Sequence, residues 1–152
     1  MLAFVGCGFH LRGTVELPAA MSVMALEDAR PATDIAYELR RGLERQGVTV
    51  VEQASMVLQL HKETYSKRVL SVDAAGRAKE YAIGYVVSFS LREKGGSAWL
   101  AGESVSVSRD LSFDAKAVLG SGGEEAQLKE EMLRDAVTSI LRRLQKARPP
   151  AE

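Results

Sequence analysis

The stretch EYAIGYVVSFSL, residues 80–91, decides the fold because it has the clearest periodicity in the chain. Large apolar side chains stand at every second position, and the residues between them are mostly smaller or polar. Successive side chains of a β-strand point to opposite faces of the sheet, so this stretch predicts a strand with one face in the core. The apolar positions are Tyr81, Ile83, Tyr85, Val87, Phe89 and Leu91.

Strands are also predicted on both sides of this stretch. Residues 56–72, MVLQLHKETYSKRVLSV, are typical of a long strand, and their apolar positions change parity part-way along, which indicates a bulge or bend. Residues 98–113 again alternate between apolar and polar side chains. The links at residues 73–79 and 94–97 contain glycine and are short enough for antiparallel hairpins.

Two amphipathic helices are predicted outside these strands. In TDIAYELRRGLERQG, residues 33–47, apolar side chains recur every four residues, Thr33 or Asp34 can cap the first turn, and Gly47 can end the helix. Gly42 costs about 1 kcal/mol relative to alanine in a helix interior, so either the backbone packs closely there or the boundary differs. A second helix ends before Pro149 and has the apolar stripe Leu133, Val137, Ile140, Leu141 and Leu144.

A buried strand at residues 21–26, MSVMAL, completes the order strand, helix, three strands, helix. This order predicts an α+β fold in which both helices pack on one face of an antiparallel four-stranded sheet. We expect the chain to divide into a short N-terminal segment, residues 1–7, a single domain, residues 8–148, and a short tail, residues 149–152.

The composition excludes several classes of protein. No apolar run reaches the roughly 20 residues that a membrane-spanning helix needs. Twenty basic and twenty acidic residues cancel, so the chain lacks the broad positive field of a nucleic-acid-binding protein, and no nucleic acid is expected as a partner. An anionic ligand therefore requires a local cluster of basic residues.

The only cysteine, Cys7, lies between two glycines near the start of the chain. Without a partner for an internal disulfide, it is a buried apolar residue, a reactive thiol or a site of covalent modification. The preceding FVG makes residues 4–7 similar to a bacterial lipobox, in which small residues precede a cysteine that becomes the lipidated first residue of the mature protein. Residues 2–6 resemble only the end of the longer apolar stretch of a signal peptide, so we expect residues 1–7 to be a truncated lipoprotein signal remnant with a lipobox-like segment.

Two stretches at opposite ends of the chain form a recognisable pair. CGFHLRG, residues 7–13, is similar to a Cys-Gly-aromatic-His-Leu-Arg start, and residues 109–144 are a strand-to-helix segment with a Glu-Met, Asp and Arg-Arg-Leu pattern. Together they resemble the LPS-assembly lipoprotein family LptE, and the order of strands and helices agrees with that family over nearly the whole chain. The matching residues of the second stretch are Glu131, Met132, Asp135, Arg142, Arg143 and Leu144.

The resemblance implies an outer-membrane lipoprotein on the periplasmic side, with its lipid attached to Cys7. It implies that the protein plugs the lumen of the β-barrel LptD, assists assembly of that barrel and binds lipopolysaccharide on its way to the outer leaflet. Gly8 fits sorting to the outer membrane, because the family context implies that aspartate at this position favours retention in the inner membrane. No cofactor is expected.

Four basic residues crowd around the first predicted hairpin: Lys67, Arg68, Arg77 and Lys79. Lipopolysaccharide presents phosphates, which lysine and arginine bind through charge-assisted hydrogen bonds, so these four are the predicted lipopolysaccharide contacts. Adjacent strand residues point to opposite faces, so at most one of Lys67 and Arg68 joins a single-faced patch. The alternative is that all four are solvated charges that protect the sheet from mispairing.

The strand ESVSVSRDLS, residues 103–112, has Ser104, Ser106 and Ser108 on the face opposite its valines. A plug inside a polar barrel lumen needs a polar, hydrogen-bonding surface, so these serines are the predicted partner-facing residues. An ordinary solvated sheet face has the same pattern.

Catalysis has little support in the sequence. His10 and His61 have no metal-ligand partner at helical or hairpin spacing, and Cys7 could use His10 only if the N-terminus folded back onto the domain. We therefore expect no enzyme and no metal. The alternative to the lipoprotein hypothesis is a non-enzymatic periplasmic or cytoplasmic accessory binding domain in which Cys7 is only structural.

Overall fold

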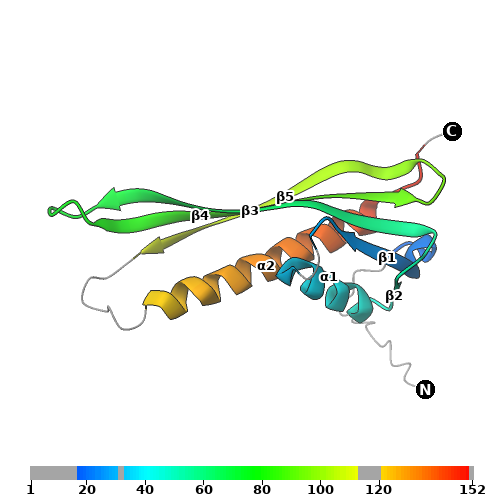
Figure 1. Ribbon diagram of the computed structural model, residues 1–152, viewed down its shortest axis with the longest axis horizontal. Coiled ribbons are helices and arrows are strands. Elements are labelled where there is room, and N and C mark those ends of the chain that lie inside the picture. Colours follow the sequence, from blue (N-terminus) through cyan, green and yellow to red (C-terminus); the bar gives the residue numbers. More distant parts are fainter. Residues whose placement is uncertain (1–16, 31–32, 113–120, 151–152) are drawn as a thin grey trace, which may run out of the picture.

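A computed structural model describes residues 17–30, 33–112 and 121–150 and shows one sheet with two helices (Figure 1). The two predicted helices and the four predicted strands are present within a few residues of the expected bounds. The elements are η1 (Ala19–Met21), β1 (Val23–Asp28), α1 (Asp34–Arg45), β2 (Thr49–Val51), β3 (Met56–Val72), β4 (Ala78–Glu93), β5 (Ala98–Ser112) and α2 (Ser121–Lys146).

The sheet has five strands in the order β2-β1-β3-β4-β5. Its central and distal part is antiparallel, as predicted, because β3, β4 and β5 are joined by hairpins. The α+β class and the packing of both helices on one face are confirmed (Figure 1).

The prediction of a four-stranded, purely antiparallel sheet is wrong. Strand β1 pairs in parallel with both β2 and β3, which makes the sheet mixed. The return of the chain through α1 allows β2 to run in the same direction as β1, since parallel neighbours need a crossover connection. The sequence analysis missed β2 because its three residues, TVV, are too few to show a period of two.

A bulge in β3 explains its change of parity. Leu60 pairs with Phe89, but the next aligned pair is Lys62 with Ser88, so the register shifts by one residue at His61. Leu58 and Leu60 are buried before the shift, and β3 is mostly exposed after it. The predicted bulge or bend is therefore confirmed.

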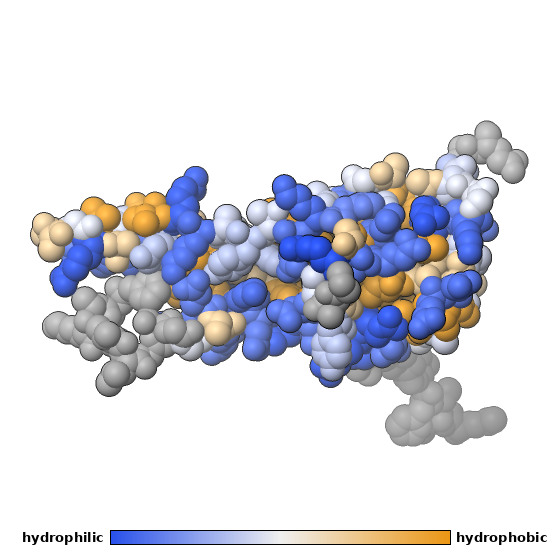
Figure 2. Space-filling view, viewed as in Figure 1, coloured by the Kyte–Doolittle hydropathy of each residue, from blue (hydrophilic) through white to orange (hydrophobic). Residues whose placement is uncertain are grey.

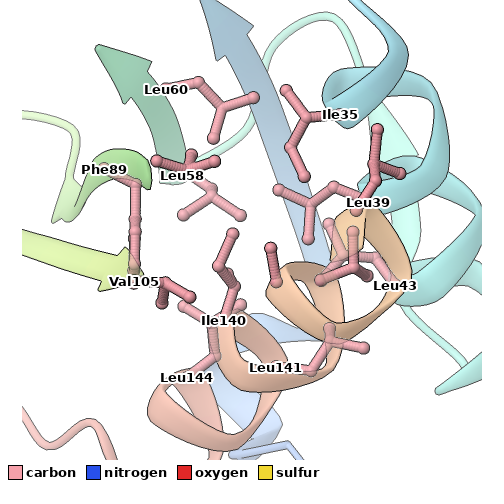
Figure 3. Close-up of a cluster of buried hydrophobic side chains, with 14 of the residues drawn as sticks. Ile35, Leu39, Leu43, Leu58, Leu60, Phe89, Val105, Ile140, Leu141 and Leu144 are labelled. Carbon is pink, nitrogen blue, oxygen red and sulfur yellow. The ribbon is translucent and has the colours of Figure 1, made fainter. Parts of the chain in front are cut away.

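The core lies between the sheet and the helix layer (Figure 3). Thr33 caps α1 by accepting a hydrogen bond from the Ala36 backbone N–H, and Gly47 ends the helix with φ 80°. Gly42 lies where the helices meet. Helix α1 contributes mainly Ile35, Leu39 and Leu43 to the core. These side chains face apolar side chains of α2 and of the sheet: Ile140, Leu141 and Leu144 from α2, and Leu58, Leu60, Phe89 and Val105 from the sheet.

The β3–β4 hairpin extends past the start of α2, so its tip has no helix beneath it (Figure 1). Helix α1 lies under the opposite half of the sheet. Across the described residues, no helix has both the length and the apolarity to cross a membrane.

Candidate functional site

Lys67 joins the β3–β4 hairpin to α2. Its Nζ lies 2.6 Å from Glu125 Oε2, and Tyr65 Oη donates to Glu125 Oε1 at 3.1 Å. Lys67 Nζ also lies 4.3 Å from the centroid of the Tyr81 ring, a cation–π distance. The hydrogen bond from Lys67 holds the pKa of Glu125 below its ordinary value, and burial together with Glu125 raises the pKa of Tyr65. This cluster couples the outer half of the sheet to the start of the long helix.

Arg68 lies on the other side of β3 from Lys67. It is exposed, as is Lys79 on β4, and neither side chain forms an ion pair with another residue that the structure describes. These two side chains are the basic groups of the hairpin that remain available to an anion.

Arg77 is held within the turn between β3 and β4. Asp73 Oδ1 accepts from the backbone N–H groups of Ala75 and Arg77, each at 2.9 Å, and Arg77 Nε donates to Asp73 Oδ2 at 2.8 Å. Gly76 has φ 77°, which the turn requires and which other residues rarely adopt. The backbone hydrogen bond from Arg77 is the main cause that lowers the pKa of Asp73. The structure thus divides the four basic residues into two that have acidic partners and two that have none in the described chain.

Ser104, Ser106 and Ser108 lie on the face of the sheet away from the helices. All three are exposed, while Val105 and Val107 between them are buried. Ser108 Oγ donates to the backbone carbonyl of Ile83 at 3.4 Å, and the hydroxyls of the other two point from the same face.

The neighbouring strands extend this small, polar face. Ser104 pairs with Ser88, Ser106 with Val86 and Ser108 with Gly84. Gly84 in turn pairs with Ser66 of β3, and an ideal Cβ at Gly84 would lie 2.6 Å from Ser66 Oγ. The sequence analysis missed Ser66, Ser88 and Gly84 because cross-strand register brings them beside β5. We call Ser66, Ser88, Ser104, Ser106 and Ser108 the serine face.

A polar cluster lies on the other face, near the start of α1. Tyr85 is 1% exposed, and its hydroxyl donates to Glu63 Oε1 at 2.5 Å, while Arg30 Nη2 lies 3.1 Å from Glu63 Oε2. Burial, followed by the effect of Glu63, raises the pKa of Tyr85 well above its ordinary value. This cluster satisfies a buried hydroxyl, and the sequence analysis predicted only that Tyr85 faces the core.

The arrangement offers little for catalysis. His61 Nε2 lies 2.8 Å from Ser90 Oγ, a contact between β3 and β4, and within the described ranges there is no group of three or more side chains suited to hold a metal. An open hollow of about 340 Å³ between α1 and α2 is lined by side chains of both charges, including Asp34, Lys129 and Glu130. Cys7 and His10 lie outside the described residues.

Comparison with known proteins decides the family. The family model LptE, described as Lipopolysaccharide-assembly, matches residues 19–144, which span all the described strands and helices except the last two residues of α2. The chain belongs to the LptE family. The resemblance drawn from the two terminal motifs is therefore confirmed.

Relatives of this LptE family member agree with that assignment. The LPS-assembly lipoprotein LptE of Photorhabdus laumondii subsp. laumondii is 29% identical over 149 residues, covering 95% of this chain and 80% of the relative. The solution NMR structure of the uncharacterized lipoprotein B from Nitrosomonas europaea has a TM-score of 0.75 at 27% identity and covers 91% of each chain. The crystal structure of the rare lipoprotein B from Shewanella oneidensis, at 24% identity and a TM-score of 0.73, covers 82% of this chain and 94% of its own and shows the shared fold.

Proposed function

We propose that this protein is an outer-membrane lipoprotein of lipopolysaccharide transport that plugs the β-barrel LptD, assists its assembly and binds lipopolysaccharide during insertion into the outer leaflet. Membership of the LptE family is the single observation that supports this most strongly. Residues 8–148 form the working domain in this proposal. Cys7 carries the lipid that holds the protein on the periplasmic side of the outer membrane.

The serine face is the surface proposed to meet the barrel wall. Short hydroxyl side chains can donate and accept hydrogen bonds without projecting far from the sheet, so a polar wall can approach closely. Without a plug, water in the barrel lumen forms hydrogen bonds with the barrel wall. A polar surface on the plug can replace these hydrogen bonds with little loss of free energy. The elongated sheet presents this face along three adjacent strands.

Arg68 and Lys79 are the proposed first contacts for lipopolysaccharide phosphates. Neither has an acidic partner among the described residues, so each can bind a phosphate without first breaking an ion pair. Lys67 and Arg77, the other two predicted contacts, bind Glu125 and Asp73 in this structure. They would contribute only if a phosphate displaced those carboxylates.

Copurification tests whether the protein binds a barrel partner. The tagged protein, expressed with a complete signal sequence, is purified from detergent-solubilised outer membranes, and a large barrel protein is expected in near one-to-one ratio with a lipid mass on Cys7. Ser106→Lys should reduce barrel recovery, whereas Ser97→Lys, at an exposed serine of the β4–β5 turn, should not. Recovery of the protein alone in the soluble fraction, with Cys7 unmodified, would contradict the proposal.

The lipid half is tested by direct binding to purified lipopolysaccharide. The double variant Arg68→Glu, Lys79→Glu should bind more weakly, and the loss should diminish at high salt because exposed charges are screened. Lys62→Glu is the matched control, since Lys62 is an exposed strand lysine six residues before Arg68, roughly 20 Å along the strand. Lys62→Glu changes the net charge by half as much as the double variant does, so a control that loses half or more of the binding free energy lost by the double variant would show that only total charge matters and would refute the assignment of these two residues.

A further inference from the structure

The tip of the β3–β4 hairpin exposes a cluster of aliphatic side chains. Val69, Leu70 and Val72 are 48%, 47% and 57% exposed, and the alanines at positions 74 and 75 in the following turn are exposed as well. We call Val69, Leu70 and Val72 the tip patch; Figure 2 shows apolar side chains gathered at this end of the molecule. Among the described residues, no other run of four contains three large exposed aliphatic residues. Single exposed aliphatic residues are ordinary, but a cluster indicates a contact surface.

The fold itself does not bury the tip patch. Among the described residues, the hydrogen bond of Lys67 with Glu125 is the side-chain link between β3 and α2 that lies nearest the tip, and the hairpin extends past the start of α2 (Figure 1). The register shifts twice between Val69 and Val72, so the regular pleat is interrupted at the patch. Within the part of the chain that the structure describes, nothing removes these aliphatic side chains from water.

The charge around the tip patch is positive. Residues 67–80 contain four basic and two acidic residues, although the whole chain is neutral. Both acids are engaged within the hairpin: Asp73 binds Arg77, and Glu80 Oε2 accepts from Ser71 Oγ at 2.6 Å. An apolar end surrounded by basic side chains complements a lipid surface, because the interior of a bilayer is hydrocarbon and the headgroups of anionic lipids are negatively charged.

We propose that the tip patch inserts among the acyl chains of an anionic lipid surface, with Arg68 and Lys79 at the level of the phosphates. Val72 follows Arg68 by four residues, roughly 13 Å along a strand, and a tilted hairpin can therefore reach the 5–10 Å at which interfacial elements insert. A stable protein interface takes roughly 20–30 residues from each partner, many more than the three residues of the tip patch. A bilayer requires neither that many residues nor a matching shape.

This inference goes beyond the proposed function, because it requires neither a barrel nor lipopolysaccharide. Failure of barrel copurification leaves it standing, and its own failure leaves the plug proposal standing. The probe is a vesicle of phosphatidylglycerol and phosphatidylcholine in equal parts, compared with one of phosphatidylcholine alone.

Insertion is measured with a single tryptophan at the tip. In a Trp99→Phe background, which removes the only native tryptophan, Leu70→Trp should shift its emission to the blue on mixing with anionic vesicles and should be quenched by bromine on the acyl chains. Val23→Trp is the control, because Val23 is a strand valine with 45% exposure outside the hairpin. Unchanged emission from Leu70→Trp, or equal quenching of both probes, would overturn the proposal.

Binding is measured with Val69→Asp and Val23→Asp, which change two valines of nearly equal exposure. Val69→Asp should weaken vesicle binding by about tenfold or more, since it removes an aliphatic group and adds a charge that the hydrocarbon excludes, whereas Val23→Asp should bind normally. If Val69→Asp does not fold, the tryptophan measurement decides alone.

Loss of binding only in the Arg68→Glu, Lys79→Glu variant, without acyl-chain quenching, would show adhesion to the surface and refute insertion. A Val69→Asp variant that binds vesicles normally but loses the barrel would assign the tip patch to a protein partner instead.

Discussion

Replacing Gly42 with alanine places two opposite effects in competition at the contact between α1 and α2. Alanine is favoured over glycine in a helix interior by about 1 kcal/mol. An ideal Cβ at this position, however, would lie 3.0 Å from Val137 Cγ1 and 3.3 Å from Leu141 Cδ1. Attractive contacts between carbon atoms lie at about 3.5–4.0 Å, so the added methyl group is too close to both.

The clash should outweigh the helix propensity. Val137 and Leu141 are 4% and 6% exposed, and the surrounding core leaves them little room to move. Overpacking of this kind typically costs about 1–3 kcal/mol, so Gly42→Ala should lower the free energy of unfolding by about 1 kcal/mol net. Val137→Ala, which costs about 2 kcal/mol by itself, removes the closer of the two contacts.

A double-mutant cycle measured by urea denaturation tests this directly. In the Val137→Ala background, Gly42→Ala should become neutral or stabilising, which gives a coupling free energy of about 1–2 kcal/mol. Gly123→Ala is the control, because Gly123 is an exposed residue in the first turn of α2 with no atom within 4 Å of the added Cβ, and it should be neutral or stabilising. If Gly42→Ala stabilises the wild-type protein, or has the same effect in both backgrounds, the close approach of the two helices does not explain the glycine.

Three further substitutions test other parts of the structure. Tyr85→Phe should cost about 1–2 kcal/mol because it leaves Glu63 without its hydroxyl donor, as measured by urea denaturation. Because the pKa of Tyr85 is raised in the folded protein, the stability that its protonated hydroxyl contributes is complete below about pH 10 and is lost as the pH rises further. The free energy of unfolding of Tyr85→Phe should therefore fall less steeply above about pH 10 than that of the wild-type protein. Glu125→Gln should lower the free energy of unfolding by under about 1 kcal/mol at neutral pH. Because the lowered pKa of Glu125 contributes stability that is lost as the pH falls, the stability of the variant should decrease less steeply at acid pH. An unchanged decrease at acid pH would contradict this. Ile140→Ala should cost about 2–5 kcal/mol in thermal or urea unfolding, because Ile140 is fully buried between the layers, and a loss below 1 kcal/mol would show that the core can collapse around the gap.

The parts of the fold that follow from periodicity were predictable from the sequence. Strand β4 alternates without interruption over more than ten residues, and α1 repeats its apolar residues every four positions, so both were predicted with nearly correct bounds. Strand β2 and its parallel pairing were not predictable in this way. Three residues define no period, and the direction of pairing depends on how the chain returns through α1.

The site was predictable as a set of residue types but not as an arrangement. The sequence places Lys67 near the hairpin, yet its partner Glu125 is 58 residues away and meets it only because α2 runs back beneath β3. Exposure of the tip patch had one available signal, since VLSV at residues 69–72 interrupts the alternation of β3 directly before a turn. The bulges there determine where these side chains point, and bulges leave only an indirect trace in sequence.

The contact between Lys67 and Glu125 separates two regions of one hairpin that differ in their physical support. Before this contact, the helix face of the sheet is covered by helices, and its side chains belong to a continuous core. Beyond it, β5 stays paired with β4 only as far as Glu80 and Ser112, and the rest of the hairpin is a two-stranded ribbon. Such a ribbon is marginally stable alone, and this one is held by the Asp73–Arg77 turn and the Ser71–Glu80 hydrogen bond. A ribbon of this kind can adjust its position without disturbing the core, because few buried contacts connect the two regions. Under the two proposals made above, this division would let a rigid domain meet the barrel wall with its serine face while the tip patch meets lipid.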